Sequence, residues 1–165
     1  MAAVAETGSG APGRAANALV LIGHLLAVGI VAGVGGWAAS GSRETYEALE
    51  LPPYAPPGWL FGPVWTVLYV LMAIAAWRSW RAAGWDRAQV AYGVQLVLNL
   101  CWTPLFFAAD AYALALVEIV VLLAALTLTL ALVGRRDRLA GWLLAPYLAW
   151  VAFATALNAG IVVLN

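Results

Sequence analysis

The sequence predicts an all-α membrane protein, a bundle of five transmembrane helices. Two observations lead to this fold class. Of the 165 residues, 65% are hydrophobic and only 10% are charged, whereas a soluble domain carries about 25% charged residues. The chain also contains five apolar runs, each long enough to cross the roughly 30 Å hydrocarbon core of a bilayer. Because lipid offers no hydrogen-bond partner to the backbone, each run should be helical.

The first apolar run, residues 18–39, follows a tail of residues 1–17 that is rich in alanine and glycine and that we expect to be disordered. His24 is the only polar side chain in this run. The alternative is a signal peptide cleaved near residues 38–40, but its apolar core would be about 7–15 residues long and its start more basic. We therefore favour a retained helix, and residues 18–165 then form one transmembrane domain.

Four further runs complete the predicted bundle, at about residues 59–80, 88–109, 112–133 and 139–164. A long connection, residues 40–58, separates the first run from the second. Its polar first half suits a short helix over the bundle. Its second half contains four prolines, which lack an N–H and favour extended geometry in the residue before them, so this part cannot be helix interior.

Arginines set the expected orientation in the membrane. All eight basic residues are arginine, which hints at a bacterial source. Seven of them lie in the tail and in the second and fourth connections, on one side of a five-span bundle, and only Arg43 lies on the other side. Because basic residues accumulate on the inner side, we expect a multi-pass protein of the bacterial cell membrane with its N-terminus inside and its C-terminus outside. The net charge of zero argues against a nucleic-acid partner.

Polar and aromatic side chains share single faces on three of the predicted helices. Amides inside a membrane are costly unless they are paired, so these faces should point into the bundle. The third run carries four such residues at helical spacing: Gln95, Asn99, Trp102 and Phe106. The second and fifth runs carry similar stripes: Trp65 and Tyr69 on one, and Tyr147, Trp150, Ala154 and Asn158 on the other.

In the expected topology the three stripes reach a similar depth and can meet beneath the proline-rich connection. An aromatic cavity with a few amides suits a large, flat, apolar ligand, because rings stack on it and amides orient it. The alternative is plain packing, since aromatic stripes in membrane bundles are commonly core or interfacial belt. The spacing alone leaves both interpretations open.

Reactive side chains are scarce. Cys101 is the only cysteine and no Cys/His pattern fits a metal site, so we expect no metal and no required cofactor. The sequence contains no catalytic triad or cofactor loop, so we expect no ordinary catalytic residue. Glu118, inside the fourth run, is either a carboxyl held within the bundle or a group that handles ligand or protons. Gly29 and Gly33 fit a close approach of two helices, within or between protomers.

Three segments resemble the signatures of the TspO/MBR family of translocator and tryptophan-rich sensory proteins. Residues 56–66 read PPGWLFGPVWT and resemble its PPxWVFGPVWT signature. Residues 95–107 read QLVLNLCWTPLFF and resemble QLxLNxxWxPxFF, and residues 146–158 read PYLAWVAFATALN and resemble PYLxWxxFAxxLN. The segments occur in the family's order, on the second, third and fifth predicted helices.

The resemblance implies a five-helix bundle, commonly a homodimer, that binds porphyrins such as protoporphyrin IX. Members are linked to tetrapyrrole metabolism and stress regulation, and some bind sterols or drug-like molecules. The family's pocket residues correspond to Trp65, Asn99, Trp150 and Ala154, and the two tryptophans are implicated in light-dependent porphyrin degradation in some members. With the stripes, these motifs predict a ligand-binding set: Tyr46, Trp65, Tyr69, Asn99, Trp102, Tyr147, Trp150, Ala154, Leu157 and Asn158.

The resemblance leaves several functions open: a porphyrin carrier or sensor, a light-dependent porphyrin-degrading protein, a sterol or lipid translocator, and a scaffold without ligand. The chain departs from the family pattern where Leu51 replaces a lysine and Tyr54 a tryptophan. Arg43 is then the only basic candidate on that side for a ligand carboxylate. The tyrosine and basic residue of the vertebrate-type cholesterol motif correspond to Ala159 and Val163, which counts against a sterol site.

Overall fold

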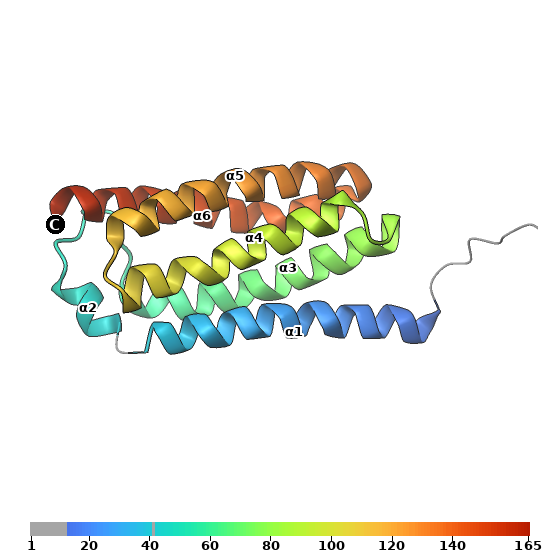
Figure 1. Cartoon of the computed structure of the whole chain (residues 1–165), viewed down its shortest axis with the longest axis horizontal. Helices are drawn as coiled ribbons and strands as arrows, with labels where there is room; N and C mark the ends of the chain where they lie inside the picture. The colour runs from blue at the N-terminus through green and yellow to red at the C-terminus, as the bar shows by residue number, and fades with distance from the viewer. Residues whose placement is uncertain (1–12, 41) are drawn as a thin grey trace, which may run out of the picture.

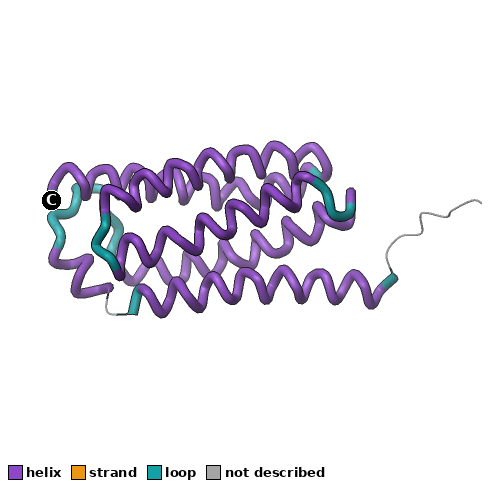
Figure 2. Tube along the Cα trace, in the orientation of Figure 1, coloured by secondary structure: helices purple, strands orange, loops and turns teal. Residues whose placement is uncertain are grey.

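The computed structural model describes residues 13–40 and 42–165, and for residues 42 and 43 only the backbone. Within these residues it consists of helices and loops without a strand (Figures 1 and 2). Five segments are long and apolar enough to span a membrane, and each contains one long helix: α1 (Arg14–Ala38), α3 (Phe61–Ala83), α4 (Arg87–Thr103), α5 (Tyr112–Arg136) and α6 (Arg138–Leu164). Three short elements connect them: α2 (Ser42–Ala48), the 3-10 helix η1 (Gly58–Leu60) and the π-helical turn η2 (Pro104–Ala108). The predicted all-α five-helix membrane bundle is confirmed.

The helix α1 begins at Arg14, earlier than the predicted start at residue 18. The residues between are mostly alanine, the best helix former, so they extend the helix into what the sequence suggested was tail. Residues 1–12 lie outside the described residues, and their predicted disorder stays a prediction.

The five long helices form a closed ring. The helix α5 packs along both α4 and α6, α3 packs along both α6 and α1, and α1 also contacts α4. The order around the bundle is therefore α1, α4, α5, α6, α3. Of the five, α1 is the least buried, so it contributes least to the core.

The connection between α1 and α3 folds over one end of the bundle, called the loop end below (Figure 1). Its proline-rich part contains no α-helix, as predicted. Two contacts tie it to α6: the Tyr54 hydroxyl donates to the Ala156 carbonyl at 3.0 Å, and the backbone N–H of Glu50 donates to Oδ1 of Asn165 at 3.0 Å. The loop is therefore held in place on the bundle that it covers.

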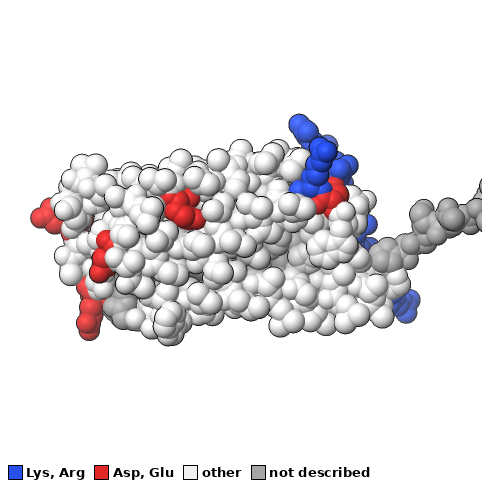
Figure 3. Space-filling view, in the orientation of Figure 1, with Lys and Arg blue, Asp and Glu red and all other residues white. Residues whose placement is uncertain are grey.

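Basic side chains gather at the opposite end, called the arginine end below (Figure 3). Two ion pairs stabilise it: Arg78 lies 2.8 Å from Asp137, and Nε of Arg136 lies 2.9 Å from Oδ2 of Asp86. The side chain of Arg43 lies outside the described part. The arginine end comprises Arg14, Arg78, Arg81, Arg87, Arg135, Arg136 and Arg138.

The helices α5 and α6 come into backbone contact near their connection. A Cβ atom on Gly141 would lie 2.9 Å from Cα of Gly134, closer than packed atoms allow. We expect Gly141→Ala to force the helices apart and to destabilise the protein by about 1–3 kcal/mol, as overpacking does. Thermal unfolding of the purified protein in detergent, followed by circular dichroism, measures this as a lower Tm.

The matched control is Gly23→Ala on α1, where no atom lies within 4 Å of the added Cβ. There alanine should be neutral or slightly stabilising, because it favours the helix by about 1 kcal/mol over glycine. Equal Tm values for the two variants would contradict the close packing of α5 on α6.

Candidate functional site

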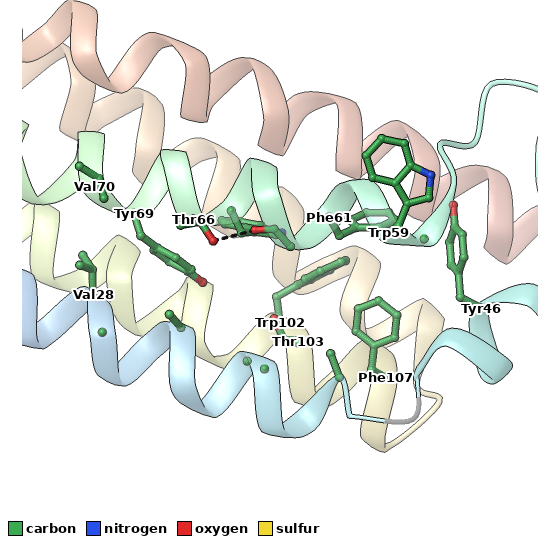
Figure 4. Close-up of a pocket in the computed structure, with 18 of the residues that line it drawn as sticks. Val28, Tyr46, Trp59, Phe61, Thr66, Tyr69, Val70, Trp102, Thr103 and Phe107 are labelled. Carbon is green, nitrogen blue, oxygen red and sulfur yellow. Dashed lines mark hydrogen bonds between the residues drawn. The ribbon is translucent and has the colours of Figure 1, made fainter.

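A cavity of about 550 Å³ lies between α1, α3 and α4 at the loop end (Figure 4). One wall is α1, which contributes mainly small residues. The opposite wall, from α3 and α4, is aromatic, and η1 and the side chain of Tyr46 from α2 close the top. None of the described residues that line the cavity is charged. The α1 wall comprises Leu25, Val28, Gly29, Ala32, Gly35, Gly36 and Ala39.

The cavity also reaches the lipid-facing surface between α1 and α3. Leu25 on α1 and Val70 on α3 both line it, yet their side chains are 41% and 47% exposed. Gly62 and Thr66, on the same side of α3, also line the cavity and are exposed. The cavity is therefore a slot that opens sideways into the bilayer.

The aromatic wall is built from stacked rings. Trp65 and Tyr69, one turn apart on α3, stack with centroids 5.3 Å apart and planes 28° apart. Trp102 on α4 stacks on Phe106 at 5.1 Å and meets Phe107 of η2 edge-on at 6.1 Å. Such arrangements are favourable for aromatic pairs, and they fix flat surfaces along one side of the slot.

Behind this wall a chain of hydrogen bonds crosses the bundle. The Tyr69 hydroxyl donates to Oδ1 of Asn99 at 3.1 Å, and Nδ2 of Asn99 donates to the Tyr147 hydroxyl at 3.1 Å. That hydroxyl donates in turn to Oε1 of Gln95 at 3.0 Å. The chain joins α3, α4 and α6, and it engages both the oxygen and the nitrogen of the Asn99 amide, the pairing that an amide needs inside a membrane.

A second set of hydrogen bonds holds Trp102. Its indole N–H donates to Oδ1 of Asn158 on α6 at 3.4 Å, and Nδ2 of Asn158 donates to the backbone carbonyl of Tyr112 at 3.0 Å. Asn158 is 1% exposed, so this pairing keeps a buried amide satisfied while it orients the tryptophan at the cavity wall.

At the top of the cavity, the Tyr46 hydroxyl donates to the Pro56 carbonyl at 3.1 Å, and its ring meets Phe61 edge-on at 5.5 Å. Burial raises the pKa of the Tyr46 hydroxyl above its usual range. The hydroxyl therefore stays protonated at neutral pH and acts as a donor that pins the loop.

The predicted site residues divide into two layers. Four of them line the cavity: Tyr46, Trp65, Tyr69 and Trp102. The other six are not part of its lining. They pack behind it: Asn99, Tyr147, Trp150, Ala154, Leu157 and Asn158.

The sequence had suggested that the stripe on α6 shares one cavity with the stripes on α3 and α4. In the structure the α6 stripe lies outside the cavity lining. The reason is packing, because Trp65 lines the cavity and its other side meets Tyr147 edge-on at 5.9 Å. Trp150 contacts Phe61, again edge-on, at 5.8 Å, and its indole N–H is buried without a partner among the described residues. A ligand role for the inner layer stays a prediction.

The wall that α1 provides was not predicted from the sequence. Gly29 was interpreted only as a site of close helix approach, yet it lines the cavity and no atom lies within 4 Å of where its Cβ would be. The available signal was a stripe of small residues at helical spacing, Gly29, Ala32, Gly36 and Ala39. A stripe of small residues leaves space beside a helix, and that space suits a ligand as well as a neighbouring helix.

Two ionisable residues lie away from the cavity lining. Both carboxyl oxygens of Glu118 on α5 are buried without a hydrogen-bond partner among the described residues. Nδ1 of His24 lies 2.8 Å from the Val20 carbonyl, and Nε2 lies 3.1 Å from Oε1 of Gln89, which links α1 to α4. His24 thus has a structural role. In the described part of the chain, no group of three His, Cys, Asp or Glu side chains could hold a metal ion.

The fold and the cavity define a multi-pass integral membrane protein with a tryptophan-rich slot at one end of five helices. The profile of the TspO/MBR family matches residues 21–164, and the chain belongs to this family. The resemblance that the three motifs indicated is confirmed.

Relatives come from all three domains of life. The chain is 38% identical over 152 residues to Tryptophan-rich protein TspO of Archaeoglobus fulgidus, and the matched region covers 90% of this chain and 99% of the relative. It is 39% identical over 115 residues to Tryptophan-rich sensory protein of Cereibacter sphaeroides, covering 70% and 73%. It is 39% identical over 118 residues to Translocator protein of Homo sapiens, covering 68% and 70%.

The Tyr147 hydroxyl is the centre of the hydrogen-bond chain behind the cavity. We expect Tyr147→Phe to leave Asn99 without an acceptor and Gln95 without a donor, and to destabilise the protein by about 1–2 kcal/mol. The measurement is the Tm in detergent. The control is Tyr92→Phe, because the Tyr92 hydroxyl is equally buried but has no partner among the described residues. A Tm loss as large in Tyr92→Phe would contradict a specific role of the chain.

Proposed function

We propose that this protein binds a large, flat, apolar ligand of the porphyrin class in the slot between α1, α3 and α4, and acts as a membrane translocator or sensor of tetrapyrroles. The observation that carries the proposal is the shape and chemistry of the slot. A cavity of about 550 Å³ falls in the range of small-molecule sites, about 300–1,000 Å³. Stacked rings on one side and glycine and alanine on the other leave room for a flat molecule between them.

The names of relatives support the translocator or sensor part of this proposal. Relatives of 38–39% identity are named as tryptophan-rich, sensory or translocator proteins. The motifs that resemble the family's ligand pocket supply Trp65 to the slot directly and Asn99 to the layer that orients Tyr69. No cofactor is needed for binding and release, and a homodimer remains what the resemblance implies.

The uncharged lining limits how such a ligand can bind. Carboxylates on a porphyrin are costly inside an apolar slot, so they should point toward the loop end and the headgroups. We also propose that the arginine end faces the inside of a bacterial cell, because basic residues collect on that side. The N-terminus is then inside, the C-terminus outside, and the slot lies in the outer half of the membrane.

A side chain placed in the slot should block it. Gly29→Phe adds a ring where Gly29 lines the cavity and no atom lies within 4 Å of the added Cβ. We expect affinity for protoporphyrin IX to fall at least ten-fold, about 1.4 kcal/mol. The measurement is a titration of the purified protein in detergent, in the dark, followed by quenching of tryptophan fluorescence.

The matched control is Gly23→Phe, on the same helix, equally open at its Cβ but outside the slot. It should bind protoporphyrin IX as the parent protein does. Equal affinity in both variants would place the porphyrin elsewhere, and weak, non-saturable quenching of the parent protein would refute porphyrin binding. Saturable binding of a sterol by a parent protein that does not bind porphyrin would favour the lipid-translocator alternative.

A second candidate function is light-dependent porphyrin degradation with dioxygen as the oxidant. Its specific support is that Trp65, an oxidisable ring on the slot wall, stacks on Tyr69 and contacts Tyr147. Trp150 lies outside the lining. We therefore expect Trp65→Phe to slow the loss of porphyrin absorbance under light by several-fold, and Trp150→Phe to slow it less. Equal rates in all three proteins, or the same loss in darkness, would exclude participation of the tryptophans.

A further inference from the structure

A second pocket lies at the arginine end, far from the slot, between the start of α4 and the end of α5. It encloses about 240 Å³ and is lined by three arginines, one aspartate and two apolar residues: Asp86, Arg87, Ala88, Leu132, Arg135 and Arg136. We propose that this pocket binds the phosphate of an anionic phospholipid.

The charge balance of the pocket favours an anion. Oδ2 of Asp86 accepts from Nε of Arg136 at 2.9 Å. Oδ1 accepts from the backbone N–H groups of Ala88 at 2.9 Å and Gln89 at 3.4 Å, which caps α4. Both oxygens of the only acid in the pocket lining are therefore engaged, and Nε is only one of the five N–H donors of the Arg136 guanidinium.

The other arginines of the pocket have no carboxylate partner among the described residues. Neither Arg87 nor Arg135 forms an ion pair there, and the second acid at this end, Asp137, pairs with Arg78 at 2.8 Å. Two uncompensated guanidinium groups thus line one small pocket. Arginine is well suited to phosphate because its planar fork can donate two parallel hydrogen bonds.

Exposed tryptophans indicate the depth of the pocket. Trp85, the residue before Asp86, is 73% exposed, and Trp142, one turn into α6, is 72% exposed. Tryptophans on the outside of a membrane protein concentrate at the level of the lipid headgroups. The pocket therefore lies where lipid phosphates lie, and basic pockets between helices at this level are a known form of headgroup recognition.

The surface next to the pocket suits acyl chains. Val90, one turn further along α4, is 68% exposed, and Leu128, two turns before the end of α5, is 56% exposed. An amphiphile whose phosphate occupies the pocket can extend its chains over these apolar side chains. A soluble phosphate compound would gain nothing from them, and on this ground we assign the pocket to a lipid.

The test uses the full-length protein in nanodiscs of phosphatidylcholine mixed with phosphatidylglycerol, with the lipids retained on the released protein counted by native mass spectrometry. The variant is Arg135→Gln, and the matched control is Arg138→Gln. Arg138 follows two residues after Arg136, the last arginine of α5, and its replacement removes the same charge outside the pocket. One basic residue contributes about 1 kcal/mol of attraction to anionic lipid, so retained phosphatidylglycerol should fall about five-fold in Arg135→Gln only.

A second variant, Arg87→Gln, tests the α4 side of the pocket independently, and Tm values confirm that each variant is folded. Arg136 is left intact because its ion pair stabilises the connection. Equal losses in Arg135→Gln and Arg138→Gln, or no loss in either pocket variant, would overturn the proposal. Displacement of phosphatidylglycerol by excess inorganic phosphate at constant ionic strength would show that the pocket binds soluble phosphate instead.

Discussion

The architecture depends on one requirement, that polar side chains at the centre of an apolar bundle bond to one another. Lipid supplies no such partner, so Tyr69, Asn99, Tyr147 and Gln95 bond to one another across α3, α4 and α6. Because each of these groups has few acceptable positions, the hydrogen bonds set the rotation of α3, α4 and α6 about their axes. Apolar packing alone, with lipid tails as apolar as leucine, gives no such preference.

The site follows from this requirement. Once Asn99 accepts from the Tyr69 hydroxyl, the Tyr69 ring and the Trp65 ring stacked on it are oriented toward α1. Asn158 orients Trp102 in the same way from α6. The amides that the sequence marks as costly thus act one layer away from the slot. They position the rings that line it, and the slot itself remains almost wholly apolar.

The sequence predicted the features that periodicity encodes. Five apolar runs gave the spans, and the spacing of Gln95, Asn99 and Trp102 gave a face that does point into the bundle. It did not reveal the order of the helices around the ring, which decides that Trp65 separates Tyr147 from the cavity. Nor did it reveal the α1 wall, since Gly29 and Ala32 contribute space rather than side chains, and a small residue predicts equally a helix contact or a cavity.

The sideways opening of the slot between Leu25 and Val70 determines how occupancy responds to concentration. A ligand that enters from the bilayer is in equilibrium with the ligand dissolved in the lipid. Partition from water has already concentrated the ligand there. Occupancy then follows the mole fraction of the ligand in the membrane, and adding lipid at a fixed total amount of ligand dilutes it. A dissociation constant calculated from the aqueous ligand concentration therefore combines two quantities, the partition of the ligand into lipid and its binding to the protein.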